Sequence, residues 1–330
     1  MRSLLIIDGH AIIHRAYHAL PPLTSNGIPV NAVHGFFVMV HRAIAELAPT
    51  HLVIAFDTPV PTFRKQLLLG YQATRPPPPD ALKSQFSLIR ELVDVARMNP
   101  LEAPGFEADD VIGTLAMRVH GTGTVTRILT GDKDILQLVR DDIFVVMPKT
   151  GLSTTVVYTP EAVRERFGLP PESIPDLKAL IGDPSDNYQS VKGIGPKTAA
   201  KLLAQFGTIE GIYERLPELA DEKLRSKLAD AAENVRKLKY IATIRQDAPV
   251  DVSLEQVRLQ PYPVEFRERL IHYGFRSLLK RYFPESAAGV QIQKDNTTNM
   301  PENSDLSTTP KKKKPNHRKK PDTASQMDLF

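Results

Sequence analysis

Nine carboxylates of this 330-residue chain stand directly after apolar runs or at the start of predicted helices and loops. The ends of parallel strands lie on one edge of a sheet, so we expect these acids to converge. Bunched carboxylates raise one another's pKa unless a cation neutralises them, and hard divalent ions such as Mg²⁺ and Mn²⁺ prefer oxygen ligands. Two such ions roughly 4 Å apart can clamp the attacking and leaving oxygens of a phosphodiester. The acids are Asp8, Asp57, Glu107, Asp109, Asp110, Asp132, Asp134, Asp183 and Asp186.

Each acid taken alone has an ordinary structural explanation. An acid after a strand is often a turn residue, and Asp or Glu in the first turn of a helix stabilises the helix dipole. That explanation does not account for nine acids in such positions together. A phosphatase of the haloacid-dehalogenase type also begins with a strand and an acid, but it requires Asp-x-Asp. Here His10 stands two residues after Asp8, which excludes that class.

The composition excludes several other chemistries. The chain has no cysteine, so disulfides, thiolate zinc sites, iron–sulfur clusters and cysteine nucleophiles are absent. No apolar run approaches the roughly 18 residues that a membrane span needs. The first apolar run ends at Asp8 after four residues, which is too short for a signal peptide. We therefore expect a cytoplasmic monomer without membrane association.

The first half of the chain must supply the sheet that positions these acids. It alternates strand-like apolar runs with helical patterns, which predicts an α/β fold with a mainly parallel sheet and flanking helices. The predicted strands are Leu4–Ile7, His51–Phe56, Val125–Leu129 and Ile143–Met147, and the predicted helices between them are Val33–Leu47 and Asp109–Val119.

The second half is predicted to be helical, because β-branched runs disappear after about Glu161. Its predicted helices are Ile174–Ile181, Lys197–Gln205, one long helix near Glu222–Ile244, and a pair over Phe266–Tyr282 hinged at Gly274. The polar composition of the sequence beyond Pro284 predicts a disordered tail. We therefore divide the chain into an acid-bearing α/β domain over 1–170, a helical domain over 171–285 and a tail over 286–330.

The net charge of +4 is unevenly distributed. From Val290 onward the chain has eight Lys and Arg against five Asp and Glu, so the tail carries most of the positive charge. A second basic segment, Thr62–Pro79, follows a predicted strand and closes with four consecutive prolines. An insertion at the carboxyl end of a strand is where an α/β protein places a loop that handles substrate.

Eight short blocks of sequence together resemble a known family. In their order they are similar to the 5′-nuclease domain of bacterial DNA polymerase I, within the flap-endonuclease superfamily, from Arg2 to about Phe283. No polymerase domain follows in this sequence, so we expect the stand-alone bacterial 5′–3′ exonuclease form. The blocks are Asp8-Gly9, Arg15 to Ala19, Ala55 to Asp57, Thr62 to Arg64, Glu107 to Val111, Thr130 to Asp134, Gly182 to Asn187 and Val191 to Gly195.

The resemblance implies a PIN-like nuclease domain and a two-metal mechanism. The protein would release 5′ nucleotides and flaps from branched or nicked duplex DNA, including RNA primers, during replication and repair. Two Mg²⁺ ions, or Mn²⁺ as a substitute, would be the cofactors. One metal cluster would consist of Asp8, Asp57, Glu107, Asp109 and Asp110, and the other of Asp132, Asp134, Asp183 and Asp186.

The segment Val191 to Ala199 has the composition of a backbone-gripping turn. Its glycines let backbone N–H groups approach a phosphate, and Pro196 stands where a helix begins. A glycine-capped turn between two helices is the ordinary alternative. In the family this is the helix–two-turn–helix, here at about 174–206, which holds duplex DNA and can seat a K⁺ ion. Its expected DNA-binding residues are Lys192, Gly193, Gly195, Lys197 and Thr198.

The basic segment resembles the family's arch, at about 60–90, through which the 5′ strand passes. Arg64, Lys65 and Arg75 would steer phosphates toward the metals; a solvated basic loop is the alternative. The family's Tyr-Lys-x-x-Arg pattern reads here Tyr71-Gln72-Ala73-Thr74-Arg75. Gln72 would donate a hydrogen bond but brings no charge, so Lys65 or Arg75 would have to compensate.

A second departure from the family lies six residues after Asp8. Relatives carry there a tyrosine that stacks on a base beside the cut, and this chain has His14. An imidazole also stacks, with less surface, so we keep His14 and its neighbour Arg15 as expected DNA contacts.

Two other functions compete with the nuclease interpretation. A PIN-type ribonuclease is disfavoured because such domains are shorter and lack the glycine turn and the helical half. A structure-specific DNA-binding protein or scaffold, with catalysis weakened at Gln72, is disfavoured because an inert fold has no use for nine mutually repelling acids.

The last residues of the chain form a separate motif. Gln326, Met327, Leu329 and Phe330 end a polar tail and resemble the short peptide with which bacterial replication proteins bind the β sliding clamp. Met327 stands where the motif usually has leucine, a swap that conserves volume. Apolar residues without a role are the alternative.

Overall fold

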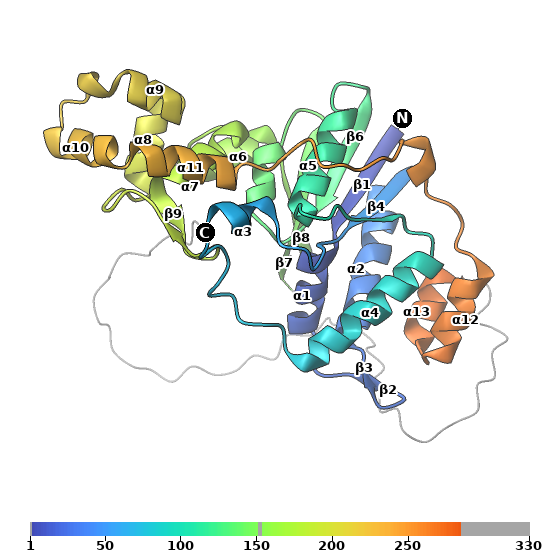
Figure 1. Ribbon diagram of the computed structural model, residues 1–330. Coiled ribbons are helices and arrows are strands. Elements are labelled where there is room, and N and C mark those ends of the chain that lie inside the picture. Colours follow the sequence, from blue (N-terminus) through green and yellow to red (C-terminus); the bar gives the residue numbers. More distant parts are fainter. Residues whose placement is uncertain (1, 151–153, 285–330) are drawn as a thin grey trace, which may run out of the picture.

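A six-stranded sheet forms the centre of the computed structural model, which describes residues 2–150 and 154–284 (Figure 1). The strand order is β5-β4-β1-β6-β7-β8, and every neighbouring pair is parallel except β7 and β8. The mainly parallel α/β fold is thereby confirmed. The strands are β1 Arg2–Asp8, β4 His51–Ala55, β5 Pro100–Leu101, β6 Thr124–Leu129, β7 Ile143–Thr150 and β8 Thr154–Tyr158.

Strand β1 lies in the middle of the sheet and is buried on both faces. Its register pairs Ile7 with Ile54 of β4 and with Leu129 of β6, so the three strands end at one level. Leu4 and Ile6 contribute to one hydrophobic core, whereas Leu5 and Ile7 contribute to the other. This alternation is the period of a strand between two layers of helices.

Helices cover both faces of the sheet. The core on one side includes residues of α1, α2, α4, α12 and α13, and the core on the other side includes residues of α5, α7, α8 and α11. Because helices cover both faces, the acids at the carboxyl ends of β1, β4 and β6 lie along the uncovered edge that these strand ends form. The helices just named are α1 Gly9–Ala19, α2 Asn31–Leu47, α4 Asp80–Val95, α5 Ala108–Val119, α7 Ile174–Ile181, α8 Pro196–Phe206, α11 Ala232–Ala242, α12 Val264–His272 and α13 Arg276–Tyr282.

Shorter elements connect these layers. The segment after β4 carries the short helix α3, and the helical half adds α6, α9 and α10. Two antiparallel pairs of two-residue strands, β2 with β3 and β9 with β10, close tight turns. Their bounds are α3 Phe63–Leu67, α6 Pro160–Phe167, α9 Ile209–Glu214, α10 Glu222–Asp230, β2 Thr24–Ser25, β3 Ile28–Pro29, β9 Gly182–Asp183 and β10 Tyr188–Gln189.

The predicted single helix over Glu222–Ile244 is wrong, because the chain leaves the helix at Ala231 and divides into α10 and α11. The two helices bury unequal faces: α10 buries Leu228, whereas α11 buries four side chains, beginning with Val235, against the core shared with α7. No proline or glycine marks the break. We therefore attribute the break at Ala231 to the different tertiary packing of α10 and α11.

The final helical pair behaves as its sequence pattern predicts. Gly274 lies between α12 and α13 with a φ of +72°, a conformation that favours glycine. Although the pair belongs to the region that we assigned to the helical domain, it packs against α2 and α4 on the sheet. The last described helices therefore return to the core that contains α1, α2 and α4 (Figure 1).

Over the described ranges, 2–150 and 154–284, the structure contains no helix that combines the length and the apolar character of a membrane span. The tail over 286–330 and its terminal motif lie outside these ranges.

Candidate metal centre

Asp8 ends β1 and at the same time caps α1. Its Oδ1 accepts a hydrogen bond from the backbone N–H of Ala11 at 3.0 Å, and its Oδ2 accepts one from the Thr130 hydroxyl at 2.6 Å. The side chain is buried, and burial raises the pKa of Asp8 to about 7 despite these two hydrogen bonds. The carboxylate is therefore fixed in position but costly to ionise without a cation.

Glu107 and Asp109 open α5 beside Asp8. Burial raises the pKa of Glu107 to about 7 although the Arg64 guanidinium lowers it. Burial also raises the pKa of Asp109 well above its usual range, and the charges of Asp132 and Asp8 raise it further. The structure thus brings these acids close enough to repel one another, as expected for the edge of a parallel sheet.

Asp57 faces the same edge from the end of β4. Its Oδ1 accepts a hydrogen bond from the backbone N–H of Ala108, at the start of α5, at 2.8 Å. The backbone N–H of Asp57 donates to Nδ1 of His10 at 3.1 Å, and burial lowers the pKa of His10. The helix start and the neutral imidazole hold Asp57 at the rim.

Asp110 has a different environment from the other acids of the first cluster. Arg64 donates to both of its oxygens, at 2.7 and 2.8 Å, and the backbone N–H groups of Glu107 and Arg245 donate to it at 3.0 and 2.8 Å. Asp110 is 0% exposed and Arg64 is 3% exposed. Unlike Asp8, Asp110 is already neutralised by a buried guanidinium that donates to both of its oxygens, which favours a structural role for Asp110 over a metal-ligating one.

The same pair determines where Arg64 lies. Its Nε donates to the carbonyl oxygen of Ile241, at the end of α11, at 2.8 Å. Arg64 therefore joins α3 to α5 and α11 in the interior. We expected it to steer phosphates from the arch, but the structure places its guanidinium away from the surface. Lys65, the next residue, is exposed.

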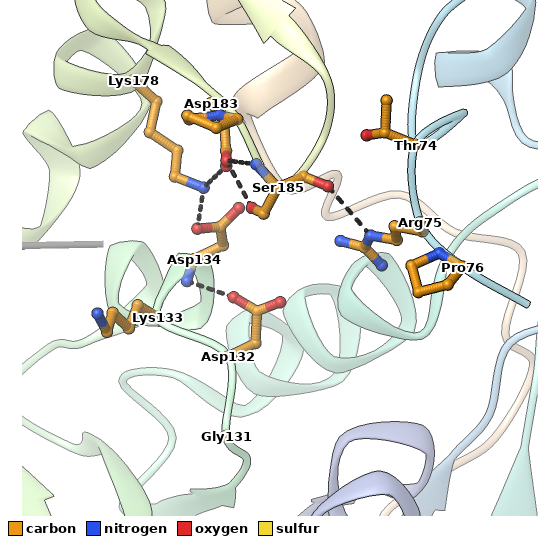
Figure 2. A pocket seen from close by; sticks show the side chains of 11 residues that line it. Thr74, Arg75, Pro76, Gly131, Asp132, Lys133, Asp134, Lys178, Asp183 and Ser185 are labelled. Atoms are coloured by element: carbon orange, nitrogen blue, oxygen red, sulfur yellow. Dashed lines mark hydrogen bonds and ion pairs between the residues drawn. The ribbon is translucent and has the colours of Figure 1, made fainter. Parts of the chain in front are cut away.

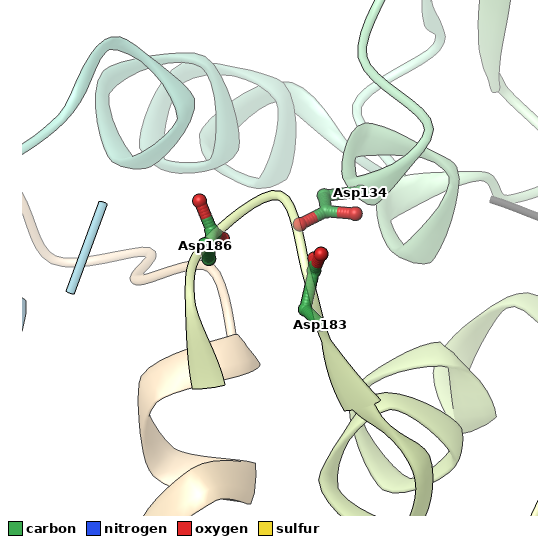
Figure 3. A group of neighbouring side chains, drawn as sticks. All are labelled: Asp134, Asp183 and Asp186. Carbon is green, nitrogen blue, oxygen red and sulfur yellow. The ribbon is translucent and has the colours of Figure 1, made fainter. Parts of the chain in front are cut away.

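The second cluster gathers three acids outside the six-stranded sheet: Asp134 follows β6, Asp183 ends β9, and Asp186 lies in the turn between β9 and β10. Oxygens of Asp134, Asp183 and Asp186 lie within 4.8 Å of one another (Figure 3). This is an all-oxygen donor set, which suits a hard divalent cation. His10, His14 and His18 are spaced four residues apart on α1 but form no such group. Among the described residues, these three aspartates are the one group of three or more potential metal ligands that lie so close together.

Asp132 lies between the two clusters. Its Oδ1 accepts a hydrogen bond from the backbone N–H of Asp134 at 2.8 Å, and its own backbone N–H donates to the Thr130 hydroxyl at 2.9 Å. Because Thr130 also donates to Asp8, this fully buried hydroxyl links the end of β1 to the loop that carries Asp132 and Asp134.

Two cations neutralise the second cluster. Lys178 of α7 makes ion pairs with Asp134 and Asp183 (Figure 2). Arg75 donates from Nη2 to Oδ1 of Asp186 at 2.7 Å, and the Gln72 amide donates to the same oxygen at 3.2 Å. Arg75 and Gln72, two residues of the Tyr71–Arg75 pattern, therefore both donate hydrogen bonds to Asp186.

The pKa values of these acids follow from the same contacts. Burial tends to raise the pKa of Asp183, but Lys178 and Ser185 outweigh it, and the pKa is lowered. Burial raises the pKa of Asp186 even though Arg75 opposes the shift. Burial, assisted by the charge of Asp132, raises the pKa of Asp134 to about 7 against the effect of Lys178.

Tyr71 bridges the two clusters. Its buried hydroxyl lies 3.3 Å from Oε2 of Glu107 and 3.3 Å from Oδ2 of Asp186. Sequence reasoning did not find this role, nor those of Thr130 and Lys178. A lysine inside the apolar run before Gly182-Asp183 was an available signal, because a buried lysine needs an acidic partner.

A cleft of about 520 Å³ opens beside the second cluster (Figure 2). Arg75 lines one side, and Asp132, Asp134 and Asp183 line the other. Residues of the arch segment and the acids therefore line the same cleft.

The predicted DNA-binding residues lie outside this cleft, on two elements. Gly193 has a φ of +86° in the turn before α8, where Lys192 and Lys197 are exposed. His14 contacts Phe86 of α4, with 5.9 Å between ring centroids, and Arg15 donates to the carbonyl oxygen of Lys149 at 2.9 Å. In Figure 1, α8, α9 and α10 lie to the left of the central sheet, farther from it than α3.

Two family models match the chain. One is described as the N-terminal resolvase-like domain of 5′–3′ exonuclease and matches residues 3–168; the other is its C-terminal SAM fold and matches residues 169–265. DNA polymerase I of Bacillus caldotenax is 42% identical over 285 residues, which are 85% of this chain and 32% of that protein. The chain thus spans about a third of the length of the curated relatives it matches.

Solved structures with the same fold have low sequence identity. The 5′-exonuclease of bacteriophage T5 with bound zinc ions gives a TM-score of 0.63 at 19% identity, over 82% of this chain and 99% of that one. A flap endonuclease of the same phage, in a complex with DNA and metal ions, gives 0.61 at 18% identity, over 85% and 97%.

Proposed function

Because the chain belongs to the 5′–3′ exonuclease family, we propose that it hydrolyses phosphodiester bonds at 5′ ends and flaps of nicked or branched duplex DNA, including RNA primers. One observation carries the proposal: two groups of carboxylates meet at one edge of the sheet, with Asp132 and the Thr130 hydroxyl between them. A buried array of repelling acids is costly to a fold that has no cation to place there.

The metal ions that fit this donor set are hard and divalent, and we propose two Mg²⁺ ions, with Mn²⁺ as a substitute. Asp8, Asp57, Glu107 and Asp109 would hold one ion, and Asp134, Asp183 and Asp186 the other, with Asp132 between them. Such ions supply Lewis-acid stabilisation of charge that develops on phosphate oxygens. Asp110, which Arg64 engages, would act by fixing the start of α5.

The chain's own residues would position the substrate. Arg75 is half-exposed at the cleft and can reach a phosphate, whereas Gln72 can donate only a neutral hydrogen bond. Arg75 is thus our candidate for the charge that the arch lysine supplies in relatives. The exposed Lys65 on α3 would assist at longer range, and His14 would contact a base on the other side of the cleft.

The turn over Val191 to Ala199 would bind the duplex backbone without reading sequence. Its support is local: Gly193 adopts the left-handed conformation, Gly195 caps α8, and Lys192 and Lys197 are exposed beside them. Thr198 lies in the first turn of α8 with its backbone N–H available to a phosphate. A K⁺ ion on the carbonyls of this turn belongs to the same proposal.

The terminal motif suggests a protein partner. We propose that Gln326, Met327, Leu329 and Phe330 bind the bacterial β sliding clamp as a short peptide whose apolar side chains fill a preformed pocket. Binding of a peptide spanning Thr323 to Phe330, measured by fluorescence anisotropy, tests this. Replacing Leu329 and Phe330 by alanine should abolish binding and leave cleavage of a clamp-free flap unchanged; clamp binding by that double variant would contradict the assignment.

The second candidate function is DNA binding with little catalysis, and Gln72 favours it because its amide brings no charge to the cleft. A 5′-labelled flap duplex incubated with Mg²⁺, with Mn²⁺ and with EDTA separates the two. We expect cleavage with either ion and none with EDTA. Binding without cleavage under any divalent ion would refute the nuclease and support the scaffold.

A further inference from the structure

Lys178 occupies an unusual place in the second cluster. Its ammonium group contacts Oδ1 of Asp134 and Oδ2 of Asp183, two of the three acids that could hold a metal ion (Figures 2 and 3). It comes from the last turn of α7, a helix whose neighbouring residues are all buried. The ammonium is therefore built into the site.

The charges of the cluster are nearly balanced without a metal. Asp134, Asp183 and Asp186 bring three negative charges when ionised, and Lys178 and Arg75 bring two positive ones. A divalent cation that approaches the same oxygens would meet the field of both cations in a partly buried site. Coulomb repulsion between cations that contact the same carboxylate oxygens is large when water is excluded.

The two cations differ in how easily they can leave. The Arg75 side chain is 51% exposed and lies on the arch segment, so it can turn toward solvent or substrate. The Lys178 side chain is 5% exposed, and its backbone is fixed within α7. Moving a lysine away from both carboxylates would leave a buried charge without a partner.

We propose that Lys178 is a resident counter-cation of the second acid cluster, which keeps the metal-free fold stable and weakens the binding of a divalent ion to Asp134 and Asp183. This inference rests on the proposed metal-binding role of the cluster. It distinguishes the second cluster from the first, in which the backbone N–H of Ala11 and the Thr130 hydroxyl hold Asp8.

Metal binding by the full chain, stripped with EDTA and titrated with Mn²⁺ alone, tests the proposal through electron paramagnetic resonance of the free ion. We expect Lys178→Met to lower the dissociation constant of the weaker site by on the order of tenfold. Lys178→Arg, which keeps the charge, should bind Mn²⁺ as the wild type does. Unchanged or weaker Mn²⁺ binding by Lys178→Met would overturn the proposal, because a lysine that merely orients Asp183 would give that result.

A matched control lies in the same half of the molecule. Lys239 also bridges two carboxylates, Asp176 at 2.7 Å and Glu210 at 2.6 Å, but it belongs to α11 and faces none of the metal-site acids. Lys239→Met should leave the Mn²⁺ dissociation constants unchanged. Adding Asp183→Asn to Lys178→Met should remove the gain in affinity, which assigns the gain to this cluster.

Thermal unfolding keeps the proposal testable if Lys178→Met folds poorly without metal. The variant leaves two carboxylates without their cation, so its Tm should fall in EDTA and rise more with Mn²⁺ than the Tm of the wild type does. An equal or smaller rise would overturn the proposal. Neither measurement involves DNA, so a protein that fails to cleave flaps could still bind Mn²⁺ as proposed, and the two failures are distinguishable.

Discussion

The two acid clusters solve the same electrostatic problem in different ways. In the first cluster, hydrogen-bond donors of the fold hold the acids: the N–H of Ala11 and the Thr130 hydroxyl for Asp8, and the N–H of Ala108 for Asp57. In the second cluster, two basic side chains, Lys178 and Arg75, neutralise the acids. Neutral dipoles thus hold Asp8 and Asp57, with buried Arg64 paired to Glu107 and Asp110 beside them, whereas basic side chains pair with the acids of the second cluster.

This difference determines which protons and cations the carboxylates of each cluster bind when no metal ion is present. Burial raises the pKa of Asp8 and Glu107 to about 7, so near neutral pH the first cluster retains protons. Lys178 lowers the pKa of Asp183, so that acid stays ionised and paired. A metal ion would therefore displace mainly protons from the first cluster, whereas in the second it would compete with Lys178 and Arg75 and also with a proton on Asp134, whose pKa is about 7.

The largest expected effect tests whether the clusters act as one catalytic unit. Asp109→Ala in the first cluster, and Asp132→Ala or Asp183→Ala in the second, should each lower single-turnover cleavage of a flap duplex by on the order of 10³-fold. DNA binding should be intact or tighter, because each change removes negative charge near phosphates. Asp94→Ala, an exposed acid on α4, is the control. Near-wild-type cleavage by an Asp132 or Asp183 variant would contradict the site assignment.

The next effect concerns the displaceable cation of the second cluster. Arg75→Ala should lower single-turnover cleavage by about 10²-fold, since it removes the half-exposed charged donor that lines the cleft beside Asp186. Gln72→Lys should raise the rate, by at most about 10²- to 10³-fold if it restores a full stabilising contact. Lys65→Ala tests the alternative donor. A Gln72→Lys rate at or below the wild-type rate would mean that Arg75 or Lys65 already supplies the needed charge.

The sequence indicates which acids end strands, but it does not indicate which side chains pair with them, for a physical reason. Asp8 and Asp57 end apolar strands, and the register of β1 with β4 follows from burial of both sheet faces. The partners of the second cluster depend on contacts between distant segments. Lys178 of α7 meets Asp134, which follows β6. In the first cluster, Arg64 of the arch segment is likewise buried against Asp110 and the Ile241 carbonyl.

Local patterns had the same limit elsewhere in the fold. The helical pair hinged at Gly274 was predicted because glycine marks the turn, whereas the break at Ala231 carries no such residue. The hydroxyls of Tyr71 and Thr130 were also missed as links between the clusters. Their roles depend on geometry over more than 100 positions of sequence, for example from Thr130 to Asp8.

The pH dependence of metal stabilisation should report on the buried acids that retain protons, which are Asp8 and Glu107 in the first cluster and Asp134 in the second. Asp8 and Glu107 have folded-state pKa values of about 7, above their ordinary values of 3.8 and 4.5. The folded state therefore binds more protons than the unfolded state, and these groups cost stability as pH rises toward and past 7. Asp183, with a lowered pKa, contributes stability that is lost only in acid.

We therefore expect Mg²⁺ to raise the Tm by more at pH 8 than at pH 6, because protons compete with the ion at pH 6. Histidines with lowered pKa values, such as His10, favour the folded state as pH rises to about 6.5 and change little above it. The comparison of Tm with and without Mg²⁺ at each pH cancels their contribution. Asp8→Asn should flatten the dependence, and an equal Mg²⁺ shift at both pH values would contradict the assignment of protons to the first cluster.

The smallest expected effect lies at the joint between the clusters. Thr130→Val keeps the shape of a fully buried side chain but removes the hydroxyl that donates to Asp8 and accepts from the N–H of Asp132. Loss of one such hydrogen bond costs about 1 kcal/mol, and an unpaired buried N–H adds a similar amount. Cleavage should therefore fall by about tenfold, well short of the loss in Asp132→Ala.

Thr130→Ser decides how that loss arises. Serine keeps the hydroxyl and loses only a methyl group, so it should restore most of the rate that valine removes. If the hydroxyl also helps Asp8 to ionise, Thr130→Val should need a higher pH or more Mg²⁺ to reach half its maximal rate, whereas Thr130→Ser should not. A uniform loss in both variants, without any shift in the pH or Mg²⁺ profile, would mean that the methyl packing matters and that the clusters are positioned independently.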